Sequence, residues 1–323
     1  MTGPAARTSA GERGFSLVEL LVALTLGVTL SFGAVGLLLR SKVSYLQDEA
    51  LAQIQENGRY ALRYIARELT MAGHLGRAPG DAPLRAAPAG SACFTLLSAT
   101  QRPLEHVDDV SAAGLGTPAL PADCRVPDHH VPRTDILVIR RTADAAHVLD
   151  GRELLAREPG ATYLRVDHAR DATSLETGGG APGPSVDIWE YTPQILFLRD
   201  FAIAEGDGVP TLCRRRLARS GHRMAPVQCL AEGIENLQVE FGVDEDGDRR
   251  ADRFYARPTA AQLRAAVAAR VFLLLRSVRK LHGFTDTSAY RLGGTRVAPP
   301  RDAYYRRVLH TTILLRNAGA APW

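Results

Sequence analysis

Two hydrophobic patterns follow each other near the start of the chain. Residues 15–39 contain a single charge, Glu19, and fifteen of these 25 residues are Leu, Val or Phe. A helix of this length spans about 37 Å at ~1.5 Å per residue, which exceeds the ~30 Å hydrocarbon core of a bilayer. The segment is therefore predicted to be a membrane-spanning helix.

Residues 40–76 keep a helical period but become amphipathic. Apolar positions recur every three or four residues, which places them on one stripe of a helix. The stripe consists of Leu51, Ile54, Gly58, Leu62, Ile65 and Leu69. Gly73 and Gly76 mark its end, because glycine readily adopts the left-handed conformation that terminates helices.

Beyond residue 76 the pattern changes to short apolar segments separated by glycine and proline. Residues 77–90 are rich in Pro, Ala and Gly, which indicates a surface loop. The segments that follow are rich in Val, Ile, Leu, Phe and Tyr, and predict an antiparallel sheet. Their ranges are 93–98, 135–140, 162–167, 187–191, 194–201, 211–217, 237–243, 269–277 and 307–316. The predicted fold class is α+β, with a long N-terminal α-helix and a C-terminal β-sheet head over residues 77–323.

The net charge of the chain is small and its basic residues are dispersed. The formal net charge is +4 and the pI is about 9.0, and the densest basic run is Arg214 to Arg216. A nucleic-acid-binding protein concentrates such charge on one face. No nucleic-acid partner is therefore expected; the alternative, a DNA receptor, would need a basic stripe on the head.

Four cysteines lie behind the predicted membrane segment: Cys93, Cys124, Cys213 and Cys229. None has the C-x2-C spacing of a zinc or redox motif. An even count in this position favours an oxidising compartment and two disulfides. Three pairings are open, and we favour the chain-local one, Cys93–Cys124 and Cys213–Cys229. The alternative is four buried free thiols in a cytosolic protein.

The carboxylate of Glu19 is the feature of the apolar run that requires an explanation. Each Leu, Val or Phe contributes about −0.3 to −0.6 kcal/mol to insertion, which together outweigh the roughly +2.5 to +3.5 kcal/mol of one carboxylate. A cleaved secretory signal peptide would have a shorter apolar core and a small-residue site after it. A plain signal anchor would leave Glu19 and the nearby Gly14 unexplained.

The sequence RGFSLVE (residues 13–19) resembles the type IV prepilin signature, in which a basic leader ends in glycine and an aromatic residue and a glutamate follow. The resemblance implies that the prepilin peptidase cleaves between Gly14 and Phe15, and that the new Phe15 amine is N-methylated. It also implies that Glu19 pairs with such an amine on a neighbouring subunit. Leader residues 1–14 would then be cytoplasmic, and the chain beyond the membrane helix periplasmic.

The sequence QENGRYALRYIARELTMAGHLG (residues 55–76) resembles a second hallmark, that of PilW-type minor pilins. The segments ARVFLLLRS (269–277) and YYRRVLHTTILLRN (304–317) resemble their closing strands. In pilins the amphipathic stripe of the helix packs on the sheet of the head, and this is expected here.

The resemblance to PilW-type proteins implies a minor pilin that initiates type IV pilus assembly with other minor pilins and the major pilin, with a tip adhesin as a further candidate partner. It implies a single-pass protein of the inner membrane that enters the extracellular pilus. Pilus biogenesis, twitching motility, adhesion and DNA uptake all stay open. The alternative is a GspJ-like pseudopilin of type II secretion, although a head of about 250 residues favours the PilW type.

The sequence VDEDGDRRAD (residues 243–252) is the main candidate for ligand binding in the head. Asp244, Asp246, Asp248 and Asp252 place four carboxylates within nine residues. Oxygen-rich loops suit a hard cation such as calcium, although Tyr255 in the twelfth position departs from an EF-hand. The alternative is a solvated acidic turn neutralised by its arginines, and no cofactor is required.

No Ser/His/Asp or Cys/His signature is recognisable in the sequence, so we do not predict an enzyme. A membrane-anchored periplasmic enzyme is the alternative from another class. It would need a pocket with perturbed acid or base groups.

Overall fold

The computed structural model describes residues 16–78, 84–86, 90–110, 120–124, 129–219 and 223–317. The predicted cleavage site, Gly14 and Phe15, lies outside these residues, as does the rest of the leader. The chain forms two compact units, Met1–Glu49 and Ala50–Trp323, and the second unit is called the head below. The boundary between them falls inside the segment 40–76, so part of the amphipathic helix belongs to the head.

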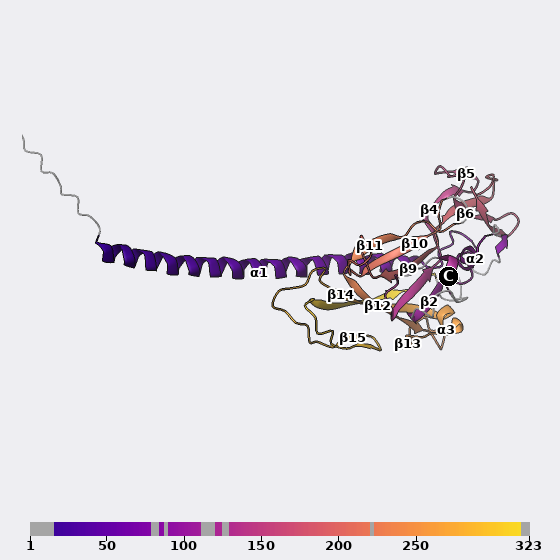
Figure 1. Ribbon diagram of the computed structural model, residues 1–323. Helices are drawn as coiled ribbons and strands as arrows, with labels where there is room; N and C mark the ends of the chain where they lie inside the picture. The colour runs from indigo at the N-terminus through magenta and orange to yellow at the C-terminus, as the bar shows by residue number, and fades with distance from the viewer. Residues whose placement is uncertain are drawn as a thin grey trace, which may run out of the picture. The chain divides into compact units, whose positions relative to one another are not determined.

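Helix α1 (Leu17–Met71) runs through both predicted helical segments without a break (Figure 1). It ends at the glycine signals, since Gly73 and Gly76 have φ angles of 80° and 64°. The N–H of Gly73 donates to the carbonyl of Arg140 at 2.9 Å, which ties the end of the helix to the head. The helix therefore stops at Met71 rather than at residue 76.

The first sheet of the head has the strand order β1-β7-β6-β8-β4-β5. Its strands are β1 (Leu84–Ala86), β4 (Thr142–Leu149), β5 (Arg152–Glu153), β6 (Thr162–Asp167), β7 (Ala172–Thr177) and β8 (Val186–Tyr191). Strand β1 pairs with β7 in parallel, while the other neighbours pair antiparallel. Strand β1 lies within the loop predicted over residues 77–90, so that prediction is wrong at this point.

The second sheet has the order β11-β10-β9-β3-β2, and the third has the order β13-β12-β14-β17. The strands of the second are β2 (Leu104–Val110), β3 (Thr134–Ile139), β9 (Gln194–Arg199), β10 (Thr211–Arg216) and β11 (Gln228–Glu232). Those of the third are β12 (Ile234–Val243), β13 (Arg253–Tyr255), β14 (Ala266–Arg276) and β17 (Arg306–Leu314). The remaining elements are the hairpin β15 (Tyr290–Leu292) and β16 (Thr295–Val297), α2 (Ala92–Leu97), η2 (Ala122–Cys124) and α3 (Ala260–Arg264).

The main core of the head lies between α1 and the second and third sheets. Ile54, Ala61, Ile65 and Leu69 of α1 are buried in it together with side chains of β3, β9, β10, β12 and β14. The predicted helical stripe therefore packs on sheets. A long N-terminal helix with an antiparallel β-sheet head confirms the predicted α+β class.

Residues 93–98, predicted to be a strand, form helix α2 instead. The side chain of Ser91 caps this helix by accepting the N–H of Phe94, and Asp123 accepts the N–H of Cys93 at 3.0 Å. A short apolar run is compatible with either a strand or a buried helix. Here the capping contacts favour the helix. The other eight predicted strands are present, with ends shifted by at most three residues.

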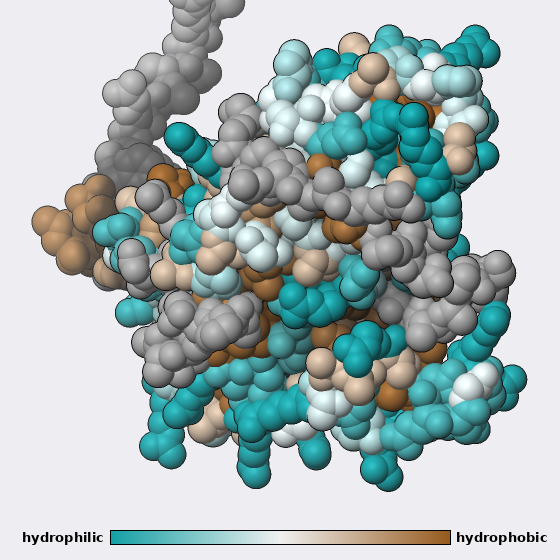
Figure 2. All heavy atoms as spheres, turned by 90° about the vertical axis from the view of Figure 1, so that its right-hand side faces the viewer, coloured by the Kyte–Doolittle hydropathy of each residue, from teal (hydrophilic) through white to brown (hydrophobic). Residues whose placement is uncertain are grey.

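The outer surface of the head differs from that of the first part of α1. Figure 1 shows β4, β5 and β6 at one side of the head and β13 and α3 at another. Figure 2 shows one face of the head, on which hydrophilic side chains predominate over scattered apolar ones. That face suits contact with water, whereas Leu17, Leu30 and Phe32 of α1 expose most of their side chains.

Candidate functional site

The first part of α1 presents an uncovered apolar surface. Among the described residues, α1 is the one helix long and apolar enough to cross a membrane by length and composition, with a mean hydropathy of 2.1 over its best window. None of that window is buried within the chain. Lipid or other apolar helices must therefore cover this surface.

Glu19 lies at the N-terminal end of this apolar surface and caps its own helix. Its Oε2 accepts the N–H of Ser16 at 3.0 Å, and its N–H donates to Oγ of Ser16 at 3.2 Å. This reciprocal pair is a capping box, and the carboxylate also lies at the positive end of the helix dipole. The Ser-x-x-Glu spacing of residues 16–19 is the signal for this cap, which the sequence analysis missed. Hydrogen bonds within one chain therefore position the Glu19 side chain without a neighbouring subunit.

A buried ionic network fixes the second part of α1 to the head. Glu68 of α1 is 3% exposed and accepts two hydrogen bonds from Arg141, at 2.7 and 3.0 Å. The side-chain amide of Gln194 also donates to Glu68, and the hydroxyl of Tyr64 donates to Gln194 at 2.7 Å. Burial raises the pKa of Tyr64, and the charge of Glu68 raises it further. The network was not predicted from the sequence; the position of Glu68, three residues after Ile65 on the inner stripe, indicates a buried acid but not its partner.

The predicted cation loop follows β12. One carboxylate oxygen each from Asp244, Asp246 and Asp252 lies within 4.8 Å of the others, whereas Asp248 is not in that group. The loop also binds its own backbone, since Asp244 accepts the N–H of Gly247 at 2.6 Å. The arrangement brings three of the four predicted ligands together.

The electrostatics of this loop favour ionised carboxylates. Burial raises the pKa of Asp244, but the backbone N–H groups of Gly247 and Arg249 lower it more, so that it lies below its usual value. A second oxygen, on Asp252, accepts the N–H of Glu245 at 2.7 Å. Charged oxygens held by the backbone are the kind of ligand that a hard cation prefers.

A second acidic cluster, around Asp135 of β3, serves to join two sheets. Its Oδ2 lies 2.8 Å from Nε2 of His106 and accepts the N–H of Val239 of β12 at 2.7 Å. Its Oδ1 accepts the N–H of Asp109 at 3.0 Å. Because both oxygens of this fully buried carboxylate have partners, the cluster is a structural tie between the second and third sheets.

The structure contains both disulfides of the chain-local pairing. Cys93 of α2 is bonded to Cys124 of η2, and Cys213 of β10 to Cys229 of β11. Three of these cysteines are buried in the core cluster on the second sheet, and Cys229 packs against it. Both disulfides therefore belong to the same core cluster of the head.

Comparison with known proteins finds a family match near each end of the chain. Residues 9–35 match the prokaryotic N-terminal methylation motif, and residues 200–317 match the type IV pilus-assembly protein W, PilW. Over these two segments the chain is similar to PilW-type type IV pilins. No curated protein sequence matches it.

A type IV-like pilin from Thermus thermophilus resembles this chain at 12% sequence identity, over 83% of this chain and 97% of its own. The TM-score of 0.36 is too low to establish a common fold. The motif match includes Gly14, Phe15 and Glu19, and the PilW match includes the acidic loop and Cys213–Cys229. Pilins, which the chain is similar to, are structural proteins as a class.

Proposed function

We propose that this chain is a minor pilin that initiates assembly of a type IV pilus together with other minor pilins and the major pilin. The observation that carries the proposal is Glu19, held at the start of an uncovered apolar helix within the methylation motif. A carboxylate without a partner is costly at low dielectric. The amine that cleavage would create at Phe15 of a neighbouring subunit supplies the opposite charge.

In this proposal the chain waits in the inner membrane as a single-pass protein with a cytoplasmic leader and a periplasmic head. The apolar surface of α1 then leaves lipid for a bundle of like helices, and the pair between Glu19 and a neighbour's Phe15 amine sets their register. The hydrophilic surface of the head suits exposure at the pilus tip, where it is open to other minor pilins or an adhesin.

The cleavage step is tested by the variants Gly14→Leu and Glu19→Ala in cells with an active prepilin peptidase. We expect Gly14→Leu to keep its leader, because a side chain there obstructs approach of the peptidase to the backbone. Glu19→Ala should be cleaved like the wild type but should assemble poorly. Mass spectrometry of the N-terminal peptide measures leader cleavage in both variants. Normal removal of the leader in Gly14→Leu would reject this cleavage site.

We propose calcium as an optional ligand of the acidic loop, supported by the proximity of Asp244, Asp246 and Asp252. Oxygen-only loops of this type in extracellular modules bind calcium with dissociation constants of about 10⁻⁴ to 10⁻³ M. Such a ligand would stiffen the end of β12 without taking part in any reaction.

Calorimetric titration of the full-length chain in detergent with millimolar calcium tests this ligand. We expect heat from the wild type, and at least a tenfold weaker affinity in the double variant Asp246→Asn/Asp252→Asn. Asparagine keeps an acceptor oxygen for the loop but removes the charge. Asp48→Asn, an exposed acid of α1, is the control and should bind like the wild type. Absence of heat in the wild type would make the loop a solvated acidic turn.

A further inference from the structure

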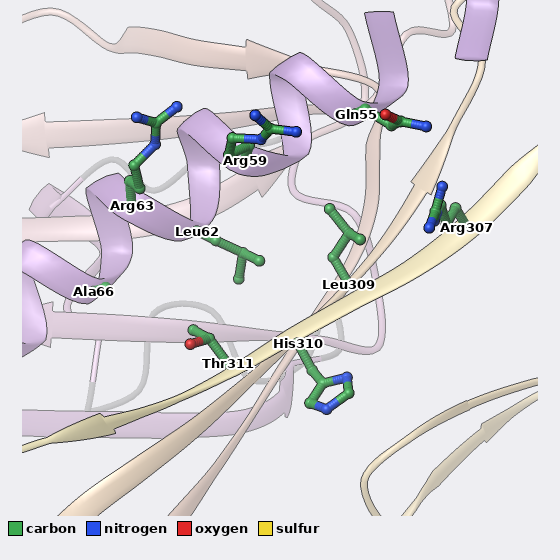
Figure 3. Close-up of a pocket in the computed structure, with 9 residues that line it drawn as sticks. All are labelled: Gln55, Arg59, Leu62, Arg63, Ala66, Arg307, Leu309, His310 and Thr311. Atoms are coloured by element: carbon green, nitrogen blue, oxygen red, sulfur yellow. The ribbon is translucent and has the colours of Figure 1, made fainter. Parts of the chain in front are cut away.

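A groove of about 410 Å³ runs between the second part of α1 and strand β17. Figure 3 shows Leu62 of α1 and Leu309 of β17 pointing toward each other at its base. Arg59 and Arg63 rise from α1, and Arg307 from β17. The groove thus has an apolar base and a basic rim, and no acidic residue lines it.

The three rim arginines are available to a ligand. Arg59, Arg63 and Arg307 are exposed, and no carboxylate of the described residues lies within ion-pair distance of them. Arg306, the neighbour of Arg307, is the contrast: it is buried and donates to Glu235 at 2.8 Å. Arg306 thus has a carboxylate partner within the head, whereas the three rim arginines have none among the described residues.

Strand β17 is the last strand of the third sheet, so one of its edges is unpaired in the described part of the chain. At one end the N–H of Leu315 donates to Val267 at 2.9 Å, and at the other the N–H of Ser277 donates to Tyr305 at 2.8 Å. Only alternate residues of an antiparallel strand bond to a given neighbour. The odd-numbered residues of β17 therefore face β14, and the even-numbered ones face outward. The outward N–H and C=O groups in the middle of the strand are those of Val308, His310 and Thr312.

We propose that this groove binds an extended, carboxylate-bearing segment of another polypeptide, which adds to β17 as a further strand. The free backbone groups of β17 supply the strand pairing. Alternate side chains of the added strand would then enter the groove beside Leu62 and Leu309, within reach of Arg59, Arg63 and Arg307. A nucleic acid would satisfy the arginines but would use neither the leucines nor the strand edge. The inference goes beyond the proposed assembly role and concerns the head alone.

The test uses the full-length chain in non-ionic detergent and a blocked ten-residue peptide, TVTETVTETV, whose valine and glutamate side chains lie on one face of an extended strand. We expect saturable binding, with slower hydrogen–deuterium exchange in residues 306–314. The triple variant Arg59→Glu/Arg63→Glu/Arg307→Glu should lose at least tenfold in affinity. The control Arg152→Glu changes an exposed arginine on β5, the edge strand of the first sheet, and should bind like the wild type.

His310→Pro separates strand addition from simple charge attraction. It removes an outward N–H that β14 does not use, and proline is tolerated when its N side faces solvent at an edge. We expect an unchanged thermal midpoint and about fivefold weaker peptide binding. The proposal is overturned by absence of peptide binding at millimolar concentration or by equal affinity in the triple variant. Equal binding of the same peptide with lysine in place of glutamate would also overturn it. Tighter binding of a ten-nucleotide oligothymidylate than of the peptide would also overturn it, in favour of a nucleic-acid site. None of these measurements involves filaments. A negative result would therefore reject strand addition at the groove and would leave the proposed assembly role unaffected.

Discussion

At the scale of single residues, the buried contact between Glu68 and Arg141 constrains how the helix packs in the head. Both side chains are nearly excluded from solvent, and Arg141 also contacts Asp144 at 3.2 Å. A buried pair of this kind adds little net stability by itself, but loss of one partner leaves a buried charge uncompensated. The pair therefore fixes the angular position of α1 on the sheets.

The variant Glu68→Gln tests this constraint. We expect a loss of about 2 to 3 kcal/mol in the free energy of unfolding, less than the ~3 to 5 kcal/mol of a fully isolated charge, because Asp144 stays beside Arg141. Denaturant unfolding of the full-length chain in detergent measures it. Glu56→Gln, an exposed acid on the same helix, is the matched control. If the two variants lose equal stability, Glu68 does not hold the helix in place.

Individual residues were predictable where a local motif governs them. The spacing of the acidic loop predicts the cluster of Asp244, Asp246 and Asp252, because neighbouring residues of one turn are close together in any fold. Glu68 and Arg141 are 73 residues apart, and only the packed structure brings them together. Long-range pairs of this kind leave no spacing signal in a single sequence.

At the scale of elements, Gly58 allows the closest approach of α1 to the third sheet. A Cβ atom at this position would lie 2.5 Å from a Leu275 methyl carbon and 2.6 Å from a Leu309 methyl carbon. Real Cβ contacts are not this short, so any larger residue requires the leucines to shift. The glycine within the QENGRYAL run thus has a packing role.

Gly58→Val should destabilise the head by about 1 to 3 kcal/mol, because overpacking forces neighbouring side chains off their preferred rotamers. The thermal midpoint of the full-length chain reports the effect. Gly33→Val, at a glycine of α1 where an added Cβ atom would meet no other atom within 4 Å, makes the same change in helix propensity and is the control. An equal midpoint in both variants would mean that the helix does not press on the sheet at Gly58.

Strand prediction succeeded for segments with dense apolar and β-branched residues. Strand β6 was predicted at residues 162–167 and is observed at Thr162–Asp167. Strand β4, TADAAHVL, was missed because alanine and aspartate have low strand propensity, and it forms by pairing with β5 and β8. Helix α2 was mistaken for a strand because its apolar run carries no period that favours either state.

At the scale of the whole molecule, the two compact units differ in the surroundings that their surfaces require. The unit Met1–Glu49 exposes apolar helix surface, whereas the unit Ala50–Trp323 buries its apolar residues in cores of its own. One disulfide joins strands β10 and β11 of the second sheet and the other joins α2 to η2, which suits a protein exposed outside the cytoplasm. This division suits a membrane-anchored subunit that presents a stable head, and in the proposed function Glu19 connects that subunit to assembly.

The central claim is that the charge of Glu19 selects a neighbouring subunit. The most direct test is the amount of Glu19→Gln subunit recovered in sheared pili, relative to the wild type, in cells that carry the other pilins. Glutamine keeps the capping box with Ser16 and removes only the charge, so the helix start is preserved. We predict normal leader cleavage and at least a tenfold loss of the subunit from the pili. Recovery of Glu19→Gln at the wild-type level would show that capping alone explains Glu19, and would contradict the claim.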